Sequence, residues 1–126
     1  MLDPLTPVGA ALLDRYLPAG QPALVITGPN LTTEILMAAD RRNLLPISHP
    51  PEDDLIESSR GRVRAAAEAV PAGTLMLTSP VPAPESGAPE FVGLELLALR
   101  TLHRRFRFQP VHRDPSGLEV VRLVPR

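Results

Sequence analysis

Two stretches of the sequence, LPAGQPALVITG at residues 17–28 and VPAGTLMLTSP at residues 70–80, repeat one junction. In each of them Pro-Ala-Gly follows a helix-like segment and leads into an apolar run. Proline cannot continue the hydrogen-bond ladder of a helix, and glycine adopts the reversed φ that commonly follows one. The continuous apolar run at residues 23–27 is typical of a strand covered on both faces. The repeat therefore predicts two helix-to-strand loops in a layered α/β fold.

The rest of the chain continues this alternation of helices and strands. Four segments have the apolar spacing and end signals of helices, namely residues 6–17, 32–42, 48–70 and 90–106. Five segments have the pattern of strands, namely residues 23–27, 44–47, 74–78, 106–113 and 118–125. The last two flank the turn sequence DPSG, which predicts a β-hairpin. We expect a single three-layer α/β domain over residues 1–126, Rossmann-like, with a mostly parallel sheet of about five strands and a C-terminal antiparallel hairpin.

Composition limits the possible functions. The chain has 126 residues, of which 44% are hydrophobic, and this suffices for one self-supporting core. Its net charge of -1 argues against a nucleic-acid-binding protein, which relies on excess positive charge. There is no cysteine, so disulfides, zinc–thiolate sites and thiol catalysis are excluded. No apolar run approaches the ~20 residues that cross a bilayer, and the start MLDPLTPVG lacks the features of a signal peptide. Outside the cytoplasm, the domain would have to be part of a longer chain.

The segment VITGPNLTTE, residues 25–34, places a turn between an expected strand and an expected helix. It lacks the lysine of a nucleotide-hydrolysing phosphate loop, so we exclude that activity. Backbone N–H groups at the start of the helix can still bind an anionic or hydroxylated ligand at the carboxyl end of the strand. The candidate ligand-binding residues here are Gly28, Asn30, Thr32 and Thr33. The simpler alternative is that Thr32 or Thr33 only caps the helix.

The densest ionisable cluster is His49 with Glu52, Asp53 and Asp54. Such residues can in principle bind a metal or transfer protons. The two prolines between them fix the backbone, however, and acidic residues favour the first turn of a helix in any case. We therefore predict no metal, no cofactor and no catalytic residue, and keep His49 and Asp53 only as candidate ligand-binding residues. His112 has no carboxylate at a telling spacing, so we expect a structural role for it.

Basic residues cluster around the end of the last expected helix, at Arg100, His103, Arg104, Arg105 and Arg107. One interpretation is contact with phosphate, either of a lipid headgroup or of a sugar-phosphate donor. The other is that these charges complement the helix dipole on a solvated face.

The ending RRFRFQPVHRDPSGLEVVRLVPR, residues 104–126, resembles that of large bacterial membrane glycosyltransferases of the GT-C type. LLDRYLPAGQPALVITGPN (12–30) resembles the segment after the last membrane helix of those enzymes, and AADRRNLLPIS (38–48) resembles a following segment. In that family catalysis depends on acidic residues in loops of the membrane portion. The resemblance implies a non-catalytic extracytoplasmic accessory domain that helps to position an acceptor, a lipid-linked donor or a partner. Its own partner would be the membrane-embedded part of the same chain or the membrane surface.

Two other functions remain open from the residues alone. One is a free-standing cytoplasmic α/β protein, either a small-molecule binder or an enzyme, that uses the Gly28–Thr33 loop. The other is a homodimer built on the helix from Phe91 to Leu102, because its apolar residues cover more than one stripe.

Overall fold

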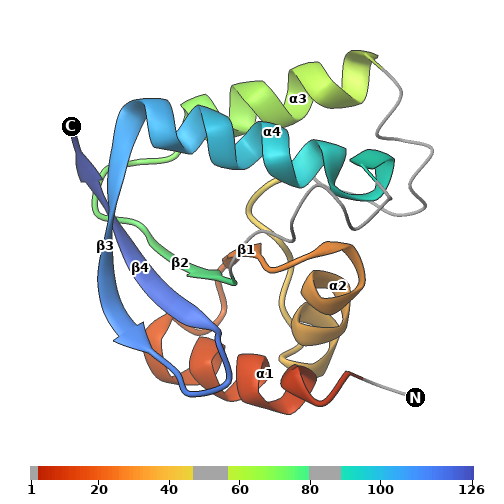
Figure 1. The fold of residues 1–126 in the computed structure, drawn as a ribbon, viewed down its shortest axis with the longest axis vertical. Helices are drawn as coiled ribbons and strands as arrows, with labels where there is room; N and C mark the ends of the chain where they lie inside the picture. The colour runs from red at the N-terminus through yellow and green to blue at the C-terminus, as the bar shows by residue number, and fades with distance from the viewer. Residues whose placement is uncertain (1–2, 47–56, 80–88) are drawn as a thin grey trace.

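The computed structural model describes residues 3–46, 57–79 and 89–126 of the chain (Figure 1). The elements in these residues are, in order, α1 (Leu5–Tyr16), β1 (Leu24–Ile26), α2 (Pro29–Ala38), α3 (Glu57–Glu68), β2 (Leu75–Thr78), α4 (Pro89–Arg105), β3 (Phe106–Arg113) and β4 (Glu119–Pro125). Within these residues, no helix is both long and apolar enough to cross a bilayer.

The four strands of the described residues form one open sheet in the order β1-β2-β4-β3. β1 and β2 pair in parallel, with Leu24 beside Met76. β4 pairs antiparallel with β2 on one side and with β3 on the other. The predicted C-terminal hairpin is therefore confirmed. The prediction of a mostly parallel sheet is wrong, because the hairpin places β4 directly beside β2 and limits parallel pairing to β1 and β2.

The strand predicted at residues 44–47 does not form in the described part of that segment. A single parallel bridge joins Ala23 to Asn43, and Leu45 is buried without belonging to a strand. The Asn43 side chain donates a hydrogen bond to the carbonyl of Val25 and accepts one from the N–H of Leu45, each at 3.2 Å. These side-chain bonds replace the regular ladder of a strand, which is why the described sheet has fewer strands than predicted. Ile47 lies outside the described residues.

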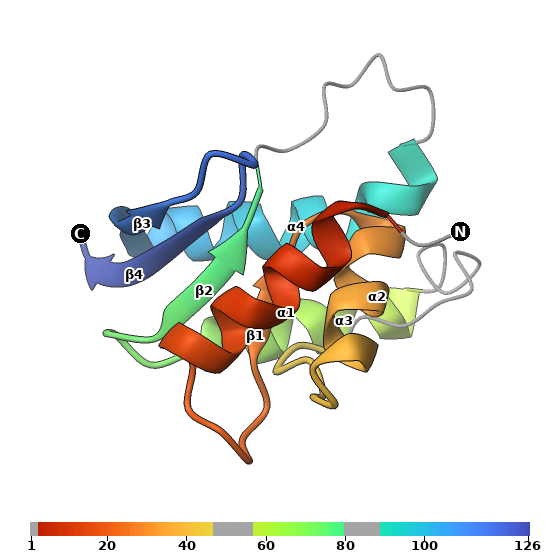
Figure 2. The same cartoon turned by 90° about the horizontal axis from the view of Figure 1, so that it is seen from below.

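Helices cover both faces of the sheet, so the predicted three-layer α/β arrangement is present (Figures 1 and 2). Leu24 and Met76 point into a core that α3 and α4 cover. Their strand neighbours Val25 and Leu77 point into a second core, against α1 and α2. Alternate residues of each strand therefore enter opposite cores, as a two-sided sheet requires.

Both Pro-Ala-Gly junctions form helix-to-strand loops, as the sequence predicts. The first joins α1 to β1 and the second joins α3 to β2. Gly20 and Gly73 have φ values of 77° and 88°, in the left-handed region that favours glycine. Because β1 and β2 are parallel, the two loops lie at one edge of the sheet and the carboxyl ends of both strands lie at the other.

The start of α2 differs from the prediction. The helix begins at Pro29, and Gly28 is its N-cap with a φ of 120°. Proline suits the first position of a helix because its missing N–H would have no partner there. The prediction that the helix begins at Thr32 or Thr33 is therefore wrong. The predicted start of the next helix, near Ser48, lies outside the described residues.

The helix α4 is buried on more than one side within its own chain. It packs against α3 and also contacts α2 and β3. Leu94, Ala98, Leu99 and Leu102 all belong to the core beneath α3 and α4. Intramolecular packing therefore accounts for the broad apolar surface of these residues. The homodimer through Phe91–Leu102 stays a prediction.

Candidate functional site

A group of buried hydroxyl-bearing residues lies at the edge of the sheet that holds the carboxyl ends of β1 and β2. Thr27 follows β1, and Thr78 is the last residue of β2. The Ser79 hydroxyl donates a hydrogen bond to the Thr27 carbonyl at 2.8 Å, which ties the two strand ends together. In open α/β sheets this edge is the usual position of a ligand.

The carboxylate of Glu95, from α4, enters this group. Its Oε2 atom accepts hydrogen bonds from the N–H of Gly28 at 3.2 Å and from the Thr32 hydroxyl at 3.1 Å. The Thr32 oxygen in turn accepts the N–H of Thr27 at 2.9 Å, and the Thr27 hydroxyl donates to it at the same distance. Glu95 is 4% exposed and Thr32 is 3% exposed. The start of α2 is thus occupied by a carboxylate of the protein itself.

Only some of the predicted ligand-binding residues belong to this cluster. Thr32 lies inside it and Gly28 contributes its N–H, whereas Thr33 is half-buried on α2. His49 and Asp53 lie outside the described residues, as does the side chain of Asn30. Ligand binding by these residues stays a prediction. Glu95 was missed by sequence reasoning, although an acidic residue among the leucines of an apolar helix is a signal, since carboxylates are seldom buried without partners.

The predicted basic cluster divides into residues with different roles. Arg105 donates from Nη1 to the carbonyls of Ala67 and Val70, at 2.8 and 2.9 Å, around the end of α3. Its guanidinium also lies over the ring of Phe106, 4.5 Å from the centroid. Arg105 therefore binds one carbonyl in the last turn of α3 and one just after the helix, where a positive charge is favourable.

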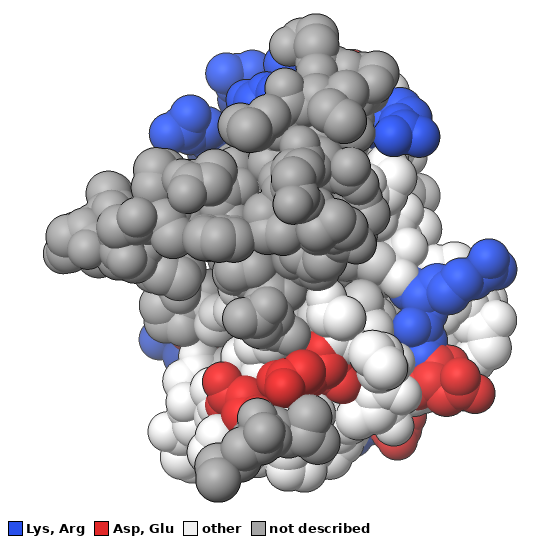
Figure 3. Space-filling view, turned by 90° about the vertical axis from the view of Figure 1, so that its right-hand side faces the viewer, with Lys and Arg blue, Asp and Glu red and all other residues white. Residues whose placement is uncertain are grey.

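Arg100 and Arg104 are exposed and four positions apart, so they project from the same side of α4. Arg107 is also exposed, but Phe106 and Phe108 pack toward α4, so Arg107 points to the opposite face of the sheet. None of the three guanidinium groups has a hydrogen bond or an ion pair with another described residue. In Figure 3, basic side chains lie at the upper end of the visible face, toward α3 and α4, and a further basic patch lies beside acidic side chains in the lower half.

Each of the two histidines in the described residues contacts another side chain of the C-terminal part of the fold. His103 stacks on Phe108 with ring centroids 3.9 Å apart, and its pKa is lowered by burial and by the nearby charge of Arg126. His112 Nε2 lies 3.3 Å from Oδ1 of Asp114, a carboxylate two residues further along the chain that the sequence analysis did not consider. Asp114 follows directly after β3, so the two side chains meet where the strand passes into the hairpin turn.

Asp114 belongs to the hairpin turn. Its Oδ2 accepts the N–H of Ser116 at 3.0 Å, and hydrogen bonds from Ser116 lower the pKa of the Asp114 carboxyl, with a smaller effect from His112. Asp114 stands between Ser116 and His112. A nucleophilic relay requires the histidine in the middle position, so this order does not provide one.

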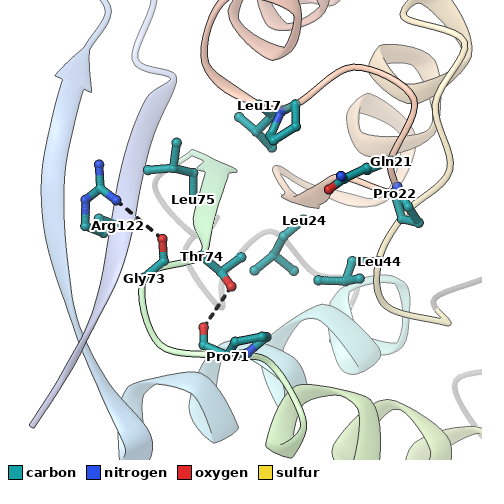
Figure 4. Close-up of a pocket in the computed structure, with 11 residues that line it drawn as sticks. Leu17, Gln21, Pro22, Leu24, Leu44, Pro71, Gly73, Thr74, Leu75 and Arg122 are labelled. Carbon is teal, nitrogen blue, oxygen red and sulfur yellow. Dashed lines mark hydrogen bonds between the residues drawn. The ribbon is translucent and has the colours of Figure 1, made fainter.

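A pocket of about 380 Å³ lies at the other edge of the sheet, between the two Pro-Ala-Gly loops (Figure 4). The first loop contributes Leu17 and Pro22 to its lining, and the second contributes Pro71 and Thr74. The parallel pairing of β1 and β2 is what brings these two loops together.

Comparison of the chain with protein-family models, with curated proteins and with solved structures gave no match.

Proposed function

We propose that the chain is a binding domain without bond-making chemistry of its own, and that it is an accessory domain of a bacterial membrane glycosyltransferase of the GT-C type. In this function it lies on the extracytoplasmic side of the membrane and helps to position an acceptor, a lipid-linked donor or a partner. The resemblance of residues 12–30, 38–48 and 104–126 to that family supports the proposal.

The observation that supports membrane docking most directly is the pair Arg100 and Arg104. Both are exposed on one side of α4, and neither guanidinium is engaged with another described residue. Arg64 is likewise exposed on α3, which packs beside α4. Each arginine near an anionic membrane surface contributes about 1 kcal/mol to binding. We call Arg64, Arg100 and Arg104 the arginine face.

The Glu95 carboxylate argues against the alternative function through the Gly28–Thr33 loop. An anionic ligand there would have to displace Glu95 from the N–H of Gly28 and the hydroxyl of Thr32. Two negative charges in one buried site repel each other, so the loop favours the closed arrangement with Glu95.

Vesicle sedimentation tests the docking. The chain should bind vesicles that contain phosphatidylglycerol and should not bind pure phosphatidylcholine vesicles. The double variant Arg100→Gln/Arg104→Gln should bind the anionic vesicles roughly 30-fold more weakly, from about 1 kcal/mol per arginine. The matched control is Arg15→Gln/Arg42→Gln, which removes the same charge from exposed positions in the α1–α2 layer. Equal losses in the two double variants, or no binding by the unmodified chain, would contradict the docking.

The genomic reading frame tests the wider assignment. We expect it to encode membrane helices upstream of this domain. A frame without such helices would rule out the accessory-domain function, even if the arginine face bound anionic lipid.

A further inference from the structure

We infer that the pocket between the two Pro-Ala-Gly loops is a binding site for a small molecule with an apolar chain and one carboxylate group. The pocket is separate from the arginine face, so this inference does not depend on membrane docking. Its volume of about 380 Å³ falls within the range of small-molecule sites, about 300–1,000 Å³.

Most of the pocket lining is apolar. Leu24 forms part of its wall from β1, and Leu75 does so from β2. Leu44 and Pro22 lie together at one end, as the close-up shows (Figure 4). Leu44 is 39% exposed, so an apolar ligand placed here would remove leucine surface from water. This end of the pocket suits a hydrocarbon chain.

One charged side chain lines the pocket among the described residues, and it lies at the opposite end. Arg122 of β4 is held there by the sheet register, which pairs it with Leu75 of β2 (Figure 4). Its Nη1 atom reaches the carbonyl of Gly73 at 3.5 Å, the limit of a hydrogen bond. The guanidinium has five N–H donors, so donors remain for a ligand. The apolar end and the cationic end thus match the two parts of an amphiphilic anion.

The charge of the site selects a carboxylate. A guanidinium binds a carboxylate through two parallel hydrogen bonds. A phosphate monoester has a charge of about −1.5 to −2 and would need a second cation, and none lines the described pocket. Thr74, also in the lining, already donates its hydroxyl proton to the carbonyl of Pro71 at 2.7 Å. Arg122 is therefore the group that recognises the anionic end.

Calorimetric titration with sodium octanoate tests this site. The unmodified chain should bind octanoate saturably, and it should bind octan-1-ol and acetate at least about tenfold more weakly, because each lacks one of the two recognised parts. If octanoate does not bind, or if octan-1-ol binds equally well, the inference is overturned.

Two pairs of variants localise the binding. Arg122→Gln should weaken octanoate binding by about tenfold, whereas Arg107→Gln, on the neighbouring strand and also exposed, should leave it unchanged. Leu44→Asp should abolish binding by placing a negative charge at the apolar end, whereas Met37→Asp, at another exposed apolar residue, should not. All four positions are exposed, so each substitution should leave the protein folded, and thermal melting of each variant verifies this. Equal effects within either pair would place octanoate elsewhere and overturn the inference.

Discussion

The Glu95 carboxylate on α4 accepts a hydrogen bond from the Thr32 hydroxyl on α2 at 3.1 Å. This contact connects the two helix layers at the carboxyl edge of the parallel strand pair. The Thr32 oxygen also accepts the N–H of Thr27, so one hydroxyl group satisfies partners on both sides. Buried polar networks of this kind contribute stability only when every member is satisfied.

Replacing Thr32 should therefore show how much its hydroxyl group contributes to the free energy of unfolding. Thr32→Val keeps the shape of the side chain but leaves the N–H of Thr27 without its acceptor, so we expect a loss of about 1–3 kcal/mol in the free energy of unfolding. Thr32→Ser keeps the hydroxyl and should lose only about 0.8 kcal/mol for the buried methyl group. Urea denaturation measures both values. A valine variant as stable as the serine variant would show that the hydroxyl does not stabilise the fold.

The contact between α1 and α2 depends on a glycine. A Cβ atom added at Gly9 would overlap Cδ1 of Ile35, whose side chain is fully buried. Gly9→Ala should therefore destabilise the protein by about 1–3 kcal/mol through overpacking. Ile35→Val in the same chain removes Cδ1 and should recover part of that loss.

Gly61 provides the matched control in α3. A Cβ atom there meets no atom of the described residues within 4 Å, so Gly61→Ala should stabilise the helix by about 0.5–1 kcal/mol. Thermal or urea unfolding of the two alanine variants should give opposite signs. A neutral Gly9→Ala variant would contradict the close approach of α1 and α2.

Arg105 stabilises the end of α3 through its two backbone acceptors, the carbonyls of Ala67 and Val70. Arg105→Met keeps the apolar stem and removes the donors, so we expect a loss of about 1–3 kcal/mol. Arg104→Met changes an exposed neighbour and should shift stability by no more than about 0.5 kcal/mol. Hydrogen exchange should show faster opening of the last turn of α3 in the Arg105 variant. Equal stability of the two variants would contradict this role.

His103 should make stability depend on pH in the acidic range. Its pKa is lowered in the folded chain by burial and then by Arg126, so the unfolded chain binds its proton first as the pH falls below the ordinary value of 6.5. The contribution of neutral His103 is fully present above that value and is lost as the pH falls toward the folded pKa.

The variant His103→Phe keeps an aromatic ring against Phe108 and removes this titration. Thermal melting of both proteins between about pH 7.5 and pH 5 measures the effect, and the variant should lose less stability on acidification. The same loss in both proteins would assign the pH dependence to other groups.

The sequence predicts those parts of the fold that depend on local chemistry. Pro-Ala-Gly follows the end of a helix at both of its occurrences, and DPSG lies in the turn between the paired strands β3 and β4. The mostly parallel sheet was predicted wrongly because the pairing of Leu75 with Arg122 joins segments far apart in the chain. No local pattern states which strand will lie beside β2.

The candidate sites depend even more on distant contacts. Thr32 was expected at a helix start, but Pro29 begins the helix and the Thr32 hydroxyl binds Thr27 and Glu95 instead. The pocket between the two Pro-Ala-Gly loops forms only because parallel strands bring these loops to one edge of the sheet. Its charged residue, Arg122, comes from a third segment and has no sequence motif around it.

The most direct test of membrane docking locates the surface that touches the bilayer. Amide signals of the chain would be recorded by NMR on phosphatidylglycerol-containing vesicles with a paramagnetic label at the headgroup. We predict that signals around Arg64, Arg100 and Arg104 broaden, while those of α1 and α2 remain sharp. Broadening centred on α1 and α2, or broadening at no residue, would contradict the proposal.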